Sequence, residues 1–253
     1  METLMLTFHN PSAPEREDEM HNWYNWVHIR DVLSMDGTVT AVQRLQLASC
    51  QPQGADLRRK FVTVYEVENK EHCTEMHSAW VGSTKLEIST AFGTDFGEGY
   101  WDIDDQTADF ATYADYAGDK AVFFARLDGG AKAPAKLTPA VLAELAALPG
   151  FKSAHLCHWS THQAPNSSAK SESVSHMLVA QVDDVYLAVQ SWDGFAERKG
   201  LAEIDAAPCV YKPLFPRFTA AESVATPERQ AITFLMHCMC GLTPKMQVYP
   251  TRG

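Results

Sequence analysis

Two stretches of the chain show the same succession of strand-like and helix-like patterns. In the first stretch, "TVTAVQRLQLA" and "FVTVYEVE" are rich in β-branched residues and alternate apolar with polar positions, as half-buried strands do. The segment "EREDEMHNWYNWVHIRDVLS" opens with an acidic turn, which suits the positive end of a helix. The first stretch predicts a strand at 4–9, a helix at 15–34, strands at 38–48 and 61–68, a helix at 69–83 and a strand at 96–104.

The second stretch repeats this order. A helix is expected to start at Thr138 and Pro139, which suit the N-cap and the first helical position. When "MDGTVTAVQRLQL" is set over "LPGFKSAHLCHWS", Gly37 falls on Gly150. The second stretch predicts a strand at 121–128, a helix at 137–148, strands at 149–160 and 173–182, a helix at 186–200 and a Pro-interrupted edge strand at 209–218.

These two β-α-β-β-α-β orders predict an α+β fold made of two tandem ferredoxin-like repeats. Each repeat would form an antiparallel sheet with helices on one face, so its open face must be covered. We therefore expect the two sheets to pack face to face as a barrel within one chain, with a cavity between them. The expected units are a first repeat with the active-site motif at 1–105, a linker at 106–120, a second repeat at 121–218 and a tail at 219–253 that docks on the body or on a partner subunit.

Composition narrows the class of protein. The 253 residues carry a formal net charge of −11, which argues against a nucleic acid or an anionic membrane as partner, because both require a basic surface. No apolar run approaches the roughly 20 residues of a membrane helix, and the first residues lack the pattern of a secretory signal. Six cysteines without disulfide-type spacing suggest thiols in a reducing compartment. We expect a cytoplasmic protein, for which a homodimer is compatible with the fold but not required by it.

The segment "NWYNWVHIRDVL" carries the strongest candidate chemistry. On a helix, His21, Tyr24, His28 and Asp31 fall on one stripe. A histidine can take up and release a proton near neutral pH, a carboxylate can fix its tautomer, and a tyrosine can donate to a developing oxyanion. We expect His28 to project into the cavity between the sheets as the catalytic acid and base, assisted by Asp31 and Tyr24. The alternative is a core histidine, with Asp31 merely near the helix end.

Strand parity suggests substrate contacts. In "LMLTFH", Thr7 and His9 share one face, and if the opposite, aliphatic face meets the helices, both point into the barrel. A solvent-exposed His9 at the strand end is the alternative. Arg44 could bind a substrate carboxylate or enolate through two hydrogen bonds, or it could be a surface charge.

The second repeat offers further pocket residues. His155, Cys157 and Trp159 alternate on one strand face, so His155 and Trp159 are expected to contact substrate, and Trp23 could wall the same apolar pocket. The His and Cys spacing matches no zinc signature, so we expect no metal site. The "HCMC" segment at 237–240 is expected to hold buried thiols.

The segments 15–47 and 61–68 resemble the EthD-like branch of the dimeric α+β barrel superfamily. Members show an acidic lead, a Trp-Tyr pair, a histidine before an Ile-Pro-Asp/Glu step, a Pro-Gly turn and a strand with an arginine. The matching positions are Glu17, Asp18 and Glu19, Trp23 and Tyr24, His28 and Ile29, Asp31, Asp36 and Gly37, and Arg44. Arg30 and Asp36 depart from the pattern by replacing its prolines, and the second repeat lacks the Trp-Tyr-His motif.

The resemblance implies a paired ferredoxin-like barrel, a pocket between the sheet and the first helix, and reactions from isomerisation and dehydration to cofactor-free oxygenation of aromatic rings. The sequence contains no dinucleotide, phosphate-loop, zinc-protease or serine-hydrolase motif, so no cofactor is expected. Haem stays an open alternative, because some branches of the superfamily bind it through one histidine.

We therefore expect an enzyme, namely a cofactor-independent lyase (dehydratase or decarboxylase) or isomerase. It would act through His28 on a small hydrophobic, aromatic or polyketide-like compound. The alternatives are a cofactor-free or haem-dependent monooxygenase in the same barrel and a non-catalytic small-molecule-binding protein.

Overall fold

The computed structural model describes residues 3–35, 38–80, 86, 88–104, 120–128, 131–163, 175–204, 206–214 and 217–223. The predicted linker up to residue 119, the "HCMC" segment and most of the predicted tail lie outside the described residues.

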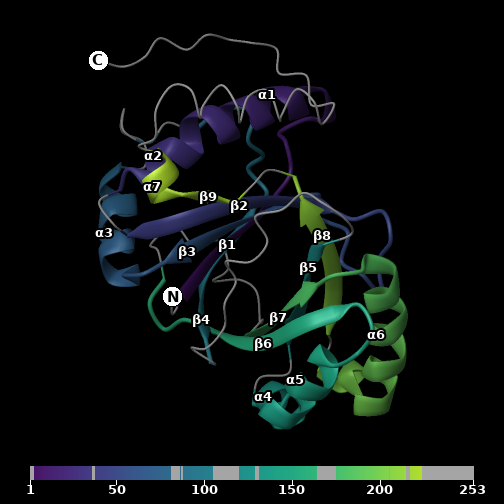
Figure 1. Cartoon of the computed structure of the whole chain (residues 1–253). Helices are drawn as coiled ribbons and strands as arrows, with labels where there is room; N and C mark the ends of the chain where they lie inside the picture. The colour runs from purple at the N-terminus through teal and green to yellow at the C-terminus, as the bar shows by residue number, and fades with distance from the viewer. Residues whose placement is uncertain are drawn as a thin grey trace.

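A closed antiparallel barrel forms the centre of the fold (Figure 1). Its strands are β1 (Thr3–His9), β2 (Val39–Leu47), β3 (Phe61–Val67), β4 (Gly97–Ile103), β5 (Ala121–Leu127), β6 (Phe151–Trp159), β7 (His176–Val182) and β8 (Ala207–Pro213). Neighbours follow the order β3, β1, β4, β6, β7, β5, β8, β2, and the pairing of β2 with β3 closes the ring. A short strand, β9 (Phe218–Thr219), also pairs with β2.

Both halves of the chain contribute four strands in the same relative order, β2-β3-β1-β4 and β6-β7-β5-β8. The halves join at two seams, where β4 pairs with β6 and β2 pairs with β8. A fold of helices and strands around a closed antiparallel barrel is thus confirmed. The predicted edge strand at 209–218 is wrong, because β8 pairs with β5 on one side and with β2 on the other.

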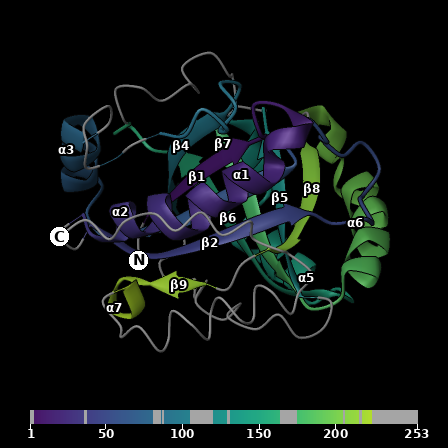
Figure 2. The same ribbon diagram turned by 90° about the horizontal axis from the view of Figure 1, so that it is seen from above.

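The helices lie outside the barrel (Figures 1 and 2). Over the first half, η1 (Pro14–Arg16), α1 (Glu17–Trp23), the π-helical turn η2 (Tyr24–His28) and α2 (Ile29–Leu33) follow one another, and α3 (Lys70–Trp80) lies beside them. The other helices are α4 (Lys132–Lys136), α5 (Pro139–Ala146), α6 (Val185–Lys199), η5 (Leu201–Ile204) and α7 (Ala220–Ser223). Among the helices of the described ranges, none is both long and apolar enough to cross a membrane.

Local sequence signals set two of these helices. Thr138 stands at the N-cap of α5 with Pro139 behind it, as predicted, although its side chain makes no capping hydrogen bond to a described residue. Asp184 does cap α6, since its carboxylate accepts from the backbone N–H of Leu187 at 3.0 Å. Gly200 ends α6 in the left-handed conformation, with φ at +61°, which glycine adopts without steric cost.

The barrel wall has an inner and an outer face, and each face carries its own core. The inner core combines both halves, for example Leu4 and Leu6 with Phe124. The outer core of the first half packs Met5 against residues of the helical segment 17–33, including Val32. The face of β1 that carries Met5, Thr7 and His9 therefore meets the helices. The expectation that Thr7 and His9 point into the barrel is wrong, because the aliphatic face fills the interior instead.

Close packing at the β4–β6 seam yields a test of this arrangement. A Cβ atom added to Gly99 would lie 2.2 Å from ring carbons of Trp159, whereas one added to Gly97 would meet no atom within 4 Å. We expect Gly99→Val to displace the indole and to lower the free energy of unfolding by about 1–3 kcal/mol, as overpacking does. Denaturant unfolding measures the change. Gly97→Val is the matched control, with a change below about 1 kcal/mol, and equal losses in both variants would contradict the packing.

Candidate functional site

A cavity of about 180 Å³ lies between the outer face of the first-half sheet and the helical segment 17–33. This is the position that the resemblance implied, and it is not the space between the two halves. The lining residues are Met5, Thr7, Trp23, Tyr24, His28, Val32, Met35, Tyr65, Cys73, His77, Ile88, Phe92, Phe96 and Glu98. Most of these side chains are apolar or aromatic, so the cavity suits a hydrophobic molecule.

Three of the predicted site residues, Trp23, Tyr24 and His28, meet in this cavity. The prediction that His28 projects into the hollow between the sheets is wrong. The helix that carries His28 covers the outside of the barrel, so the sheet itself separates the imidazole from the interior.

His28 is held by a short chain of hydroxyl groups. Its Nε2 atom lies 3.1 Å from the hydroxyl oxygen of Tyr65, which in turn is hydrogen-bonded to the hydroxyl of Tyr24 at 2.6 Å. The other ring nitrogen, Nδ1, is buried and has no hydrogen-bond partner in the part of the chain that the structure describes. One nitrogen is therefore oriented by Tyr65, and a ligand would reach the other, which is buried, after a small shift of the ring.

Burial keeps this polar cluster uncharged. It lowers the pKa of His28 to about 3, and the nearby His77 and Arg44 act in the same direction. Burial also raises the pKa of Tyr24 and, more strongly, of Tyr65. The imidazole and both phenols are thus neutral near pH 7, because a charged form would lose its hydration in this buried position.

Sequence reasoning missed Tyr65 and Glu98. Thr7 on β1 pairs with Glu98 on β4, and Met5 pairs with both Tyr65 on β3 and Tyr100 on β4, so these side chains share the outer face of the wall. The hydroxyl of Thr7 lies 3.4 Å from the Glu98 carboxylate. The alternation in "FVTVYEVE" and "FGEGYWDID" carried this signal, but only the pairing of the strands shows that the residues converge.

Asp31 does not join His28 in the wall of the cavity. It lies half-buried on α2 and is not among the cavity-lining residues that the structure describes. The π-helical turn at Tyr24–His28 adds one residue to the turn, so positions after it rotate away from the stripe that a regular α-helix predicts. The geometry thus pairs His28 with Tyr65 rather than with a carboxylate one turn away.

Arg44 and His9 lie in the same layer as the cavity but behind its wall. Arg44 is fully buried and donates hydrogen bonds to Oδ1 of Asn25 at 2.7 Å and to Nδ1 of His21 at 3.0 Å. Its guanidinium lies 4.3 Å from the ring centroid of Tyr24. The surface-charge alternative for Arg44 is therefore wrong. Its guanidinium packs against the Tyr24 ring instead.

His9 stacks on Tyr24 with ring centroids 5.1 Å apart and is fully buried, so the solvent-exposed alternative is also wrong. Burial lowers the pKa of His9 well below its ordinary value, with Arg44, His21 and His28 adding to the shift. His9 is thus a second neutral imidazole, placed as a packing partner of the site.

The predicted contacts from the second half lie elsewhere. Trp159 packs in the inner core, edge to face with Trp101 at a centroid distance of 5.0 Å. His155 pairs with Val179, whose side chain belongs to the inner core, so it faces the barrel interior. Neither can reach a ligand in the sheet–helix cavity, because the barrel wall lies between.

Within the described ranges, no group of three or more His, Cys, Asp or Glu side chains is arranged to hold a metal ion. Haem does not fit the cavity. A void of about 150 Å³ takes up one benzene ring, whereas a porphyrin contains four pyrrole rings. The cavity of about 180 Å³ therefore matches a ligand of about one ring.

The neutral state of His28 makes a testable prediction. The pKa of about 3 in the folded protein lies below the ordinary value of 6.5, so the unfolded chain binds a proton first as the pH falls. His28 thus costs stability between about pH 6.5 and pH 3, by up to about 1.4 kcal/mol per pH unit. We expect its Cε1–H resonance to stay unshifted from pH 7 to 5. In His28→Gln the free energy of unfolding should depend less steeply on pH, because unfolding takes up as much as one proton fewer. A titration midpoint of the His28 resonance near pH 6.5 would contradict the prediction.

No protein-family model and no curated protein matches this chain. Solved structures do match it. An anthrone oxidase-like protein superposes with a TM-score of 0.62 at 12% sequence identity, covering 89% of this chain and 96% of that protein. A candidate monooxygenase from Fusobacterium nucleatum subsp. nucleatum superposes with a TM-score of 0.51 at 8% identity, covering 86% and 94%. At these identities the likeness shows the fold, and the chain has the dimeric α+β barrel architecture within one polypeptide.

Proposed function

We propose that this chain is an enzyme that oxidises a small phenolic compound with molecular oxygen, without an organic cofactor, in the sheet–helix cavity. The observation that carries the proposal is the environment of His28. It is a neutral imidazole that Tyr65 holds at one nitrogen, while its other nitrogen has no partner among the described residues. It stands in the wall of an apolar cavity sized for one ring.

The cavity walls favour an aromatic substrate. Trp23, Phe92 and Phe96 present rings, and Met5 and Ile88 add aliphatic and thioether surface. Aromatic rings prefer edge-to-face and offset contacts with such neighbours. The polar groups are few and close together, so they would fix the orientation of a substrate hydroxyl rather than bind a charged molecule.

The role of His28 is to take the hydroxyl proton of the substrate. Its low pKa is set by burial in the absence of an anion, and a phenolate beside the ring would raise it. Proton transfer therefore creates an ion pair whose members stabilise each other in a dry cavity. Tyr65 keeps the ring oriented during the transfer.

The phenolate is electron-rich enough to reduce oxygen directly, so the reaction balances without an added reductant. For a hydroquinone, one ring C–H bond is converted to C–OH while the ring becomes a quinone. One hydroquinone and one O₂ give one hydroxyquinone and one water. The names of the two structural relatives favour this oxygen chemistry among the reactions that a histidine could serve.

A second candidate function is the lyase or isomerase that the sequence suggested. Glu98 favours it, because a carboxylate shares the cavity lining with His28 and two titratable groups could pass a proton between two substrate atoms.

We also propose that the two halves are ferredoxin-like repeats of the EthD-like type, a relationship supported by their common strand order.

Oxygen uptake tests the first proposal. With hydroquinone or methylhydroquinone, purified protein should consume oxygen above the rate of autoxidation, and His28→Gln should lower the excess rate by about 10²–10⁴-fold, as loss of an acid–base group does. Tyr65→Phe should lower it less, since the ring stays in place but loses its orienting bond. His72→Gln is the matched control, because the His72 side chain is 41% exposed and does not line the cavity.

Glu98→Gln separates the two candidate functions. An oxygenase that depends on His28 should keep most of its oxygen uptake in this variant, because the carboxylate takes no part in forming the phenolate. A proton-shuttling isomerase or dehydratase should lose about 10²-fold or more of its turnover without consuming oxygen. Unchanged oxygen uptake in His28→Gln would sink the oxygenase proposal.

A further inference from the structure

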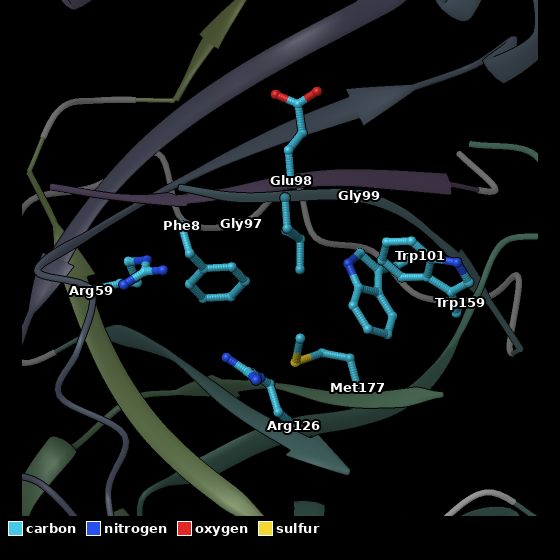
Figure 3. Close-up of a pocket in the computed structure, with 10 residues that line it drawn as sticks. Phe8, Arg59, Gly97, Glu98, Gly99, Trp101, Arg126, Trp159 and Met177 are labelled. Atoms are coloured by element: carbon cyan, nitrogen blue, oxygen red, sulfur yellow. The ribbon is translucent and has the colours of Figure 1, made fainter. Parts of the chain in front are cut away.

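A second, smaller cavity lies inside the barrel, on the other side of the wall from His28. Its volume is about 30 Å³, and its lining includes Phe8, Trp101, Trp159 and Met177. Figure 3 shows that the Glu98 carboxylate points away from this cavity, so the two sites use opposite faces of β4. A void of about 30 Å³ exceeds the roughly 10–15 Å³ that one water molecule needs, so an occupant has only a few heavy atoms unless side chains move.

Two arginines from different halves of the chain line this cavity. Arg59 comes from the segment before β3, and Arg126 comes from β5. Their side chains are 16% and 23% exposed. Figure 3 shows both guanidinium groups on the Phe8 side, with Trp101 and Trp159 opposite. A guanidinium offers a planar fork of N–H donors that matches a carboxylate.

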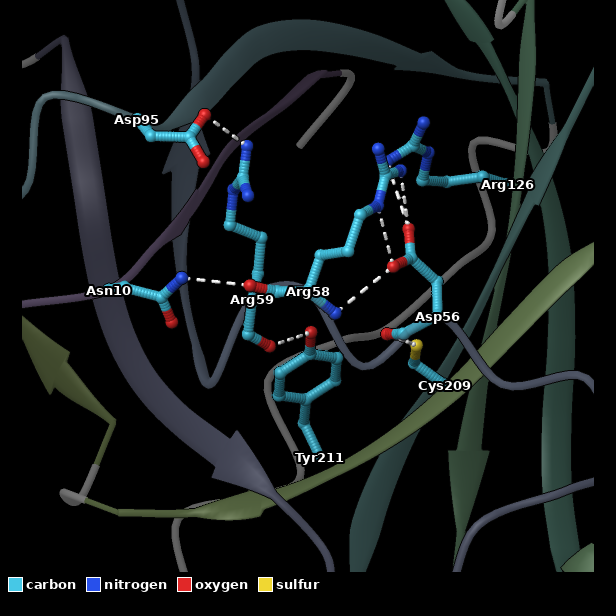
Figure 4. Close-up of polar contacts among 8 residues, drawn as sticks. All are labelled: Asn10, Asp56, Arg58, Arg59, Asp95, Arg126, Cys209 and Tyr211. Atoms are coloured by element: carbon cyan, nitrogen blue, oxygen red, sulfur yellow. Dashed lines mark hydrogen bonds and ion pairs between the residues drawn. The ribbon is translucent and has the colours of Figure 1, made fainter.

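Two neighbouring carboxylates pair with these arginines (Figure 4). Asp56 accepts from Arg58 at 2.9 and 2.7 Å and lies 3.3 Å from Arg126. Arg59 pairs with Asp95 at 2.6 Å, but the Asp95 side chain is 82% exposed. Because the Asp95 partner is so exposed, solvent screens the pair, and Asp95 can be exchanged for another anion.

The loop between β2 and β3, which carries Asp56 and Arg59, is anchored to the barrel. The hydroxyl of Tyr211 donates to the backbone oxygen of Arg59 at 2.8 Å, and the thiol of Cys209 donates to that of Asp56 at 2.6 Å. Both anchors lie on β8 (Figure 4). The loop therefore holds its guanidinium groups in place before a ligand arrives, which reduces the entropy cost of binding.

The void lies beside two glycines on the inner face of β4, a face that also carries Trp101. Gly97 and Gly99 both line it, and a Cβ atom at Gly97 would meet no atom within 4 Å. Phe8 and Met177 supply apolar surface at the same place. The cavity thus combines two arginines with room for a small apolar group.

We propose that this end of the barrel is a binding site for a small carboxylate of the size of acetate. The carboxylate would accept from Arg59, in exchange for Asp95, and from Arg126. The methyl group would occupy the space beside Gly97, against Phe8 and Met177. Because the two arginines belong to different halves, the anion would bridge the first half of the chain to the second.

The test is a titration with sodium acetate against sodium chloride at equal ionic strength, followed by the indole N–H resonances of Trp101 and Trp159. We expect a saturable shift with acetate only. Arg59→Gln and Arg126→Gln should each weaken binding by about tenfold, because a charge-assisted hydrogen bond is lost. Arg58→Gln is the matched control, since Arg58 contacts the same Asp56 but is 59% exposed and does not line the cavity.

Gly97→Val distinguishes binding inside the barrel from binding on its surface. The added side chain fills the void while both arginines remain, so the acetate shift should disappear. Thermal melts establish that each variant is folded, and if Arg126→Gln unfolds, Arg59→Gln and Gly97→Val still decide. The proposal is overturned by a chloride response equal to that of acetate, by equal weakening in Arg58→Gln, or by undiminished binding in Gly97→Val.

Discussion

Closure of the barrel by strand pairing is the constraint on which the rest of this structure depends. The seams between β4 and β6 and between β2 and β8 leave none of the strands β1 to β8 at an edge. Closure gives every strand a defined inner and outer face, and side chains alternate between them. The inner face joins the two halves through one apolar core, and the outer face of the first half packs on the helical segment 17–33.

The buried polar layer beneath that helical segment is stable because its members are neutral or hydrogen-bonded. His28, Tyr65 and Tyr24 form one chain, and Arg44 bonds to Asn25 and His21 while lying over the Tyr24 ring. Arginine can only donate, so Nδ1 of His21 must accept and its proton resides on Nε2, 3.7 Å from Glu17. The buried charge of Arg44 is tolerated because Asn25 and His21 accept hydrogen bonds from it and the Tyr24 ring lies against it.

Strand β4 shows how one element can serve two cavities. Glu98 and Tyr100 face the helix layer, while Gly97, Gly99 and Trp101 face the barrel interior. The outer cavity is larger and mostly apolar, and the inner one is small and lined by two arginines. The sheet lies between them, so the two proposed ligands would bind on opposite faces of β4.

The sequence by itself determined the elements, because periodicity and capping are local. Most predicted strands and helices lie within a few residues of the observed bounds, although β8 ends at Pro213 and the short elements α4, η5, β9 and α7 were not predicted. The stretch containing His28 and Tyr24 did mark a cavity. The tertiary structure decided which face of β1 points inward, that β8 is paired on both sides, and that Tyr65 rather than Asp31 contacts His28. The alternation of side chains along a strand predicts which residues share a face, but it does not predict which element covers that face. Strand partners distant in sequence, and a π-helical turn that shifts the helix register, make that choice.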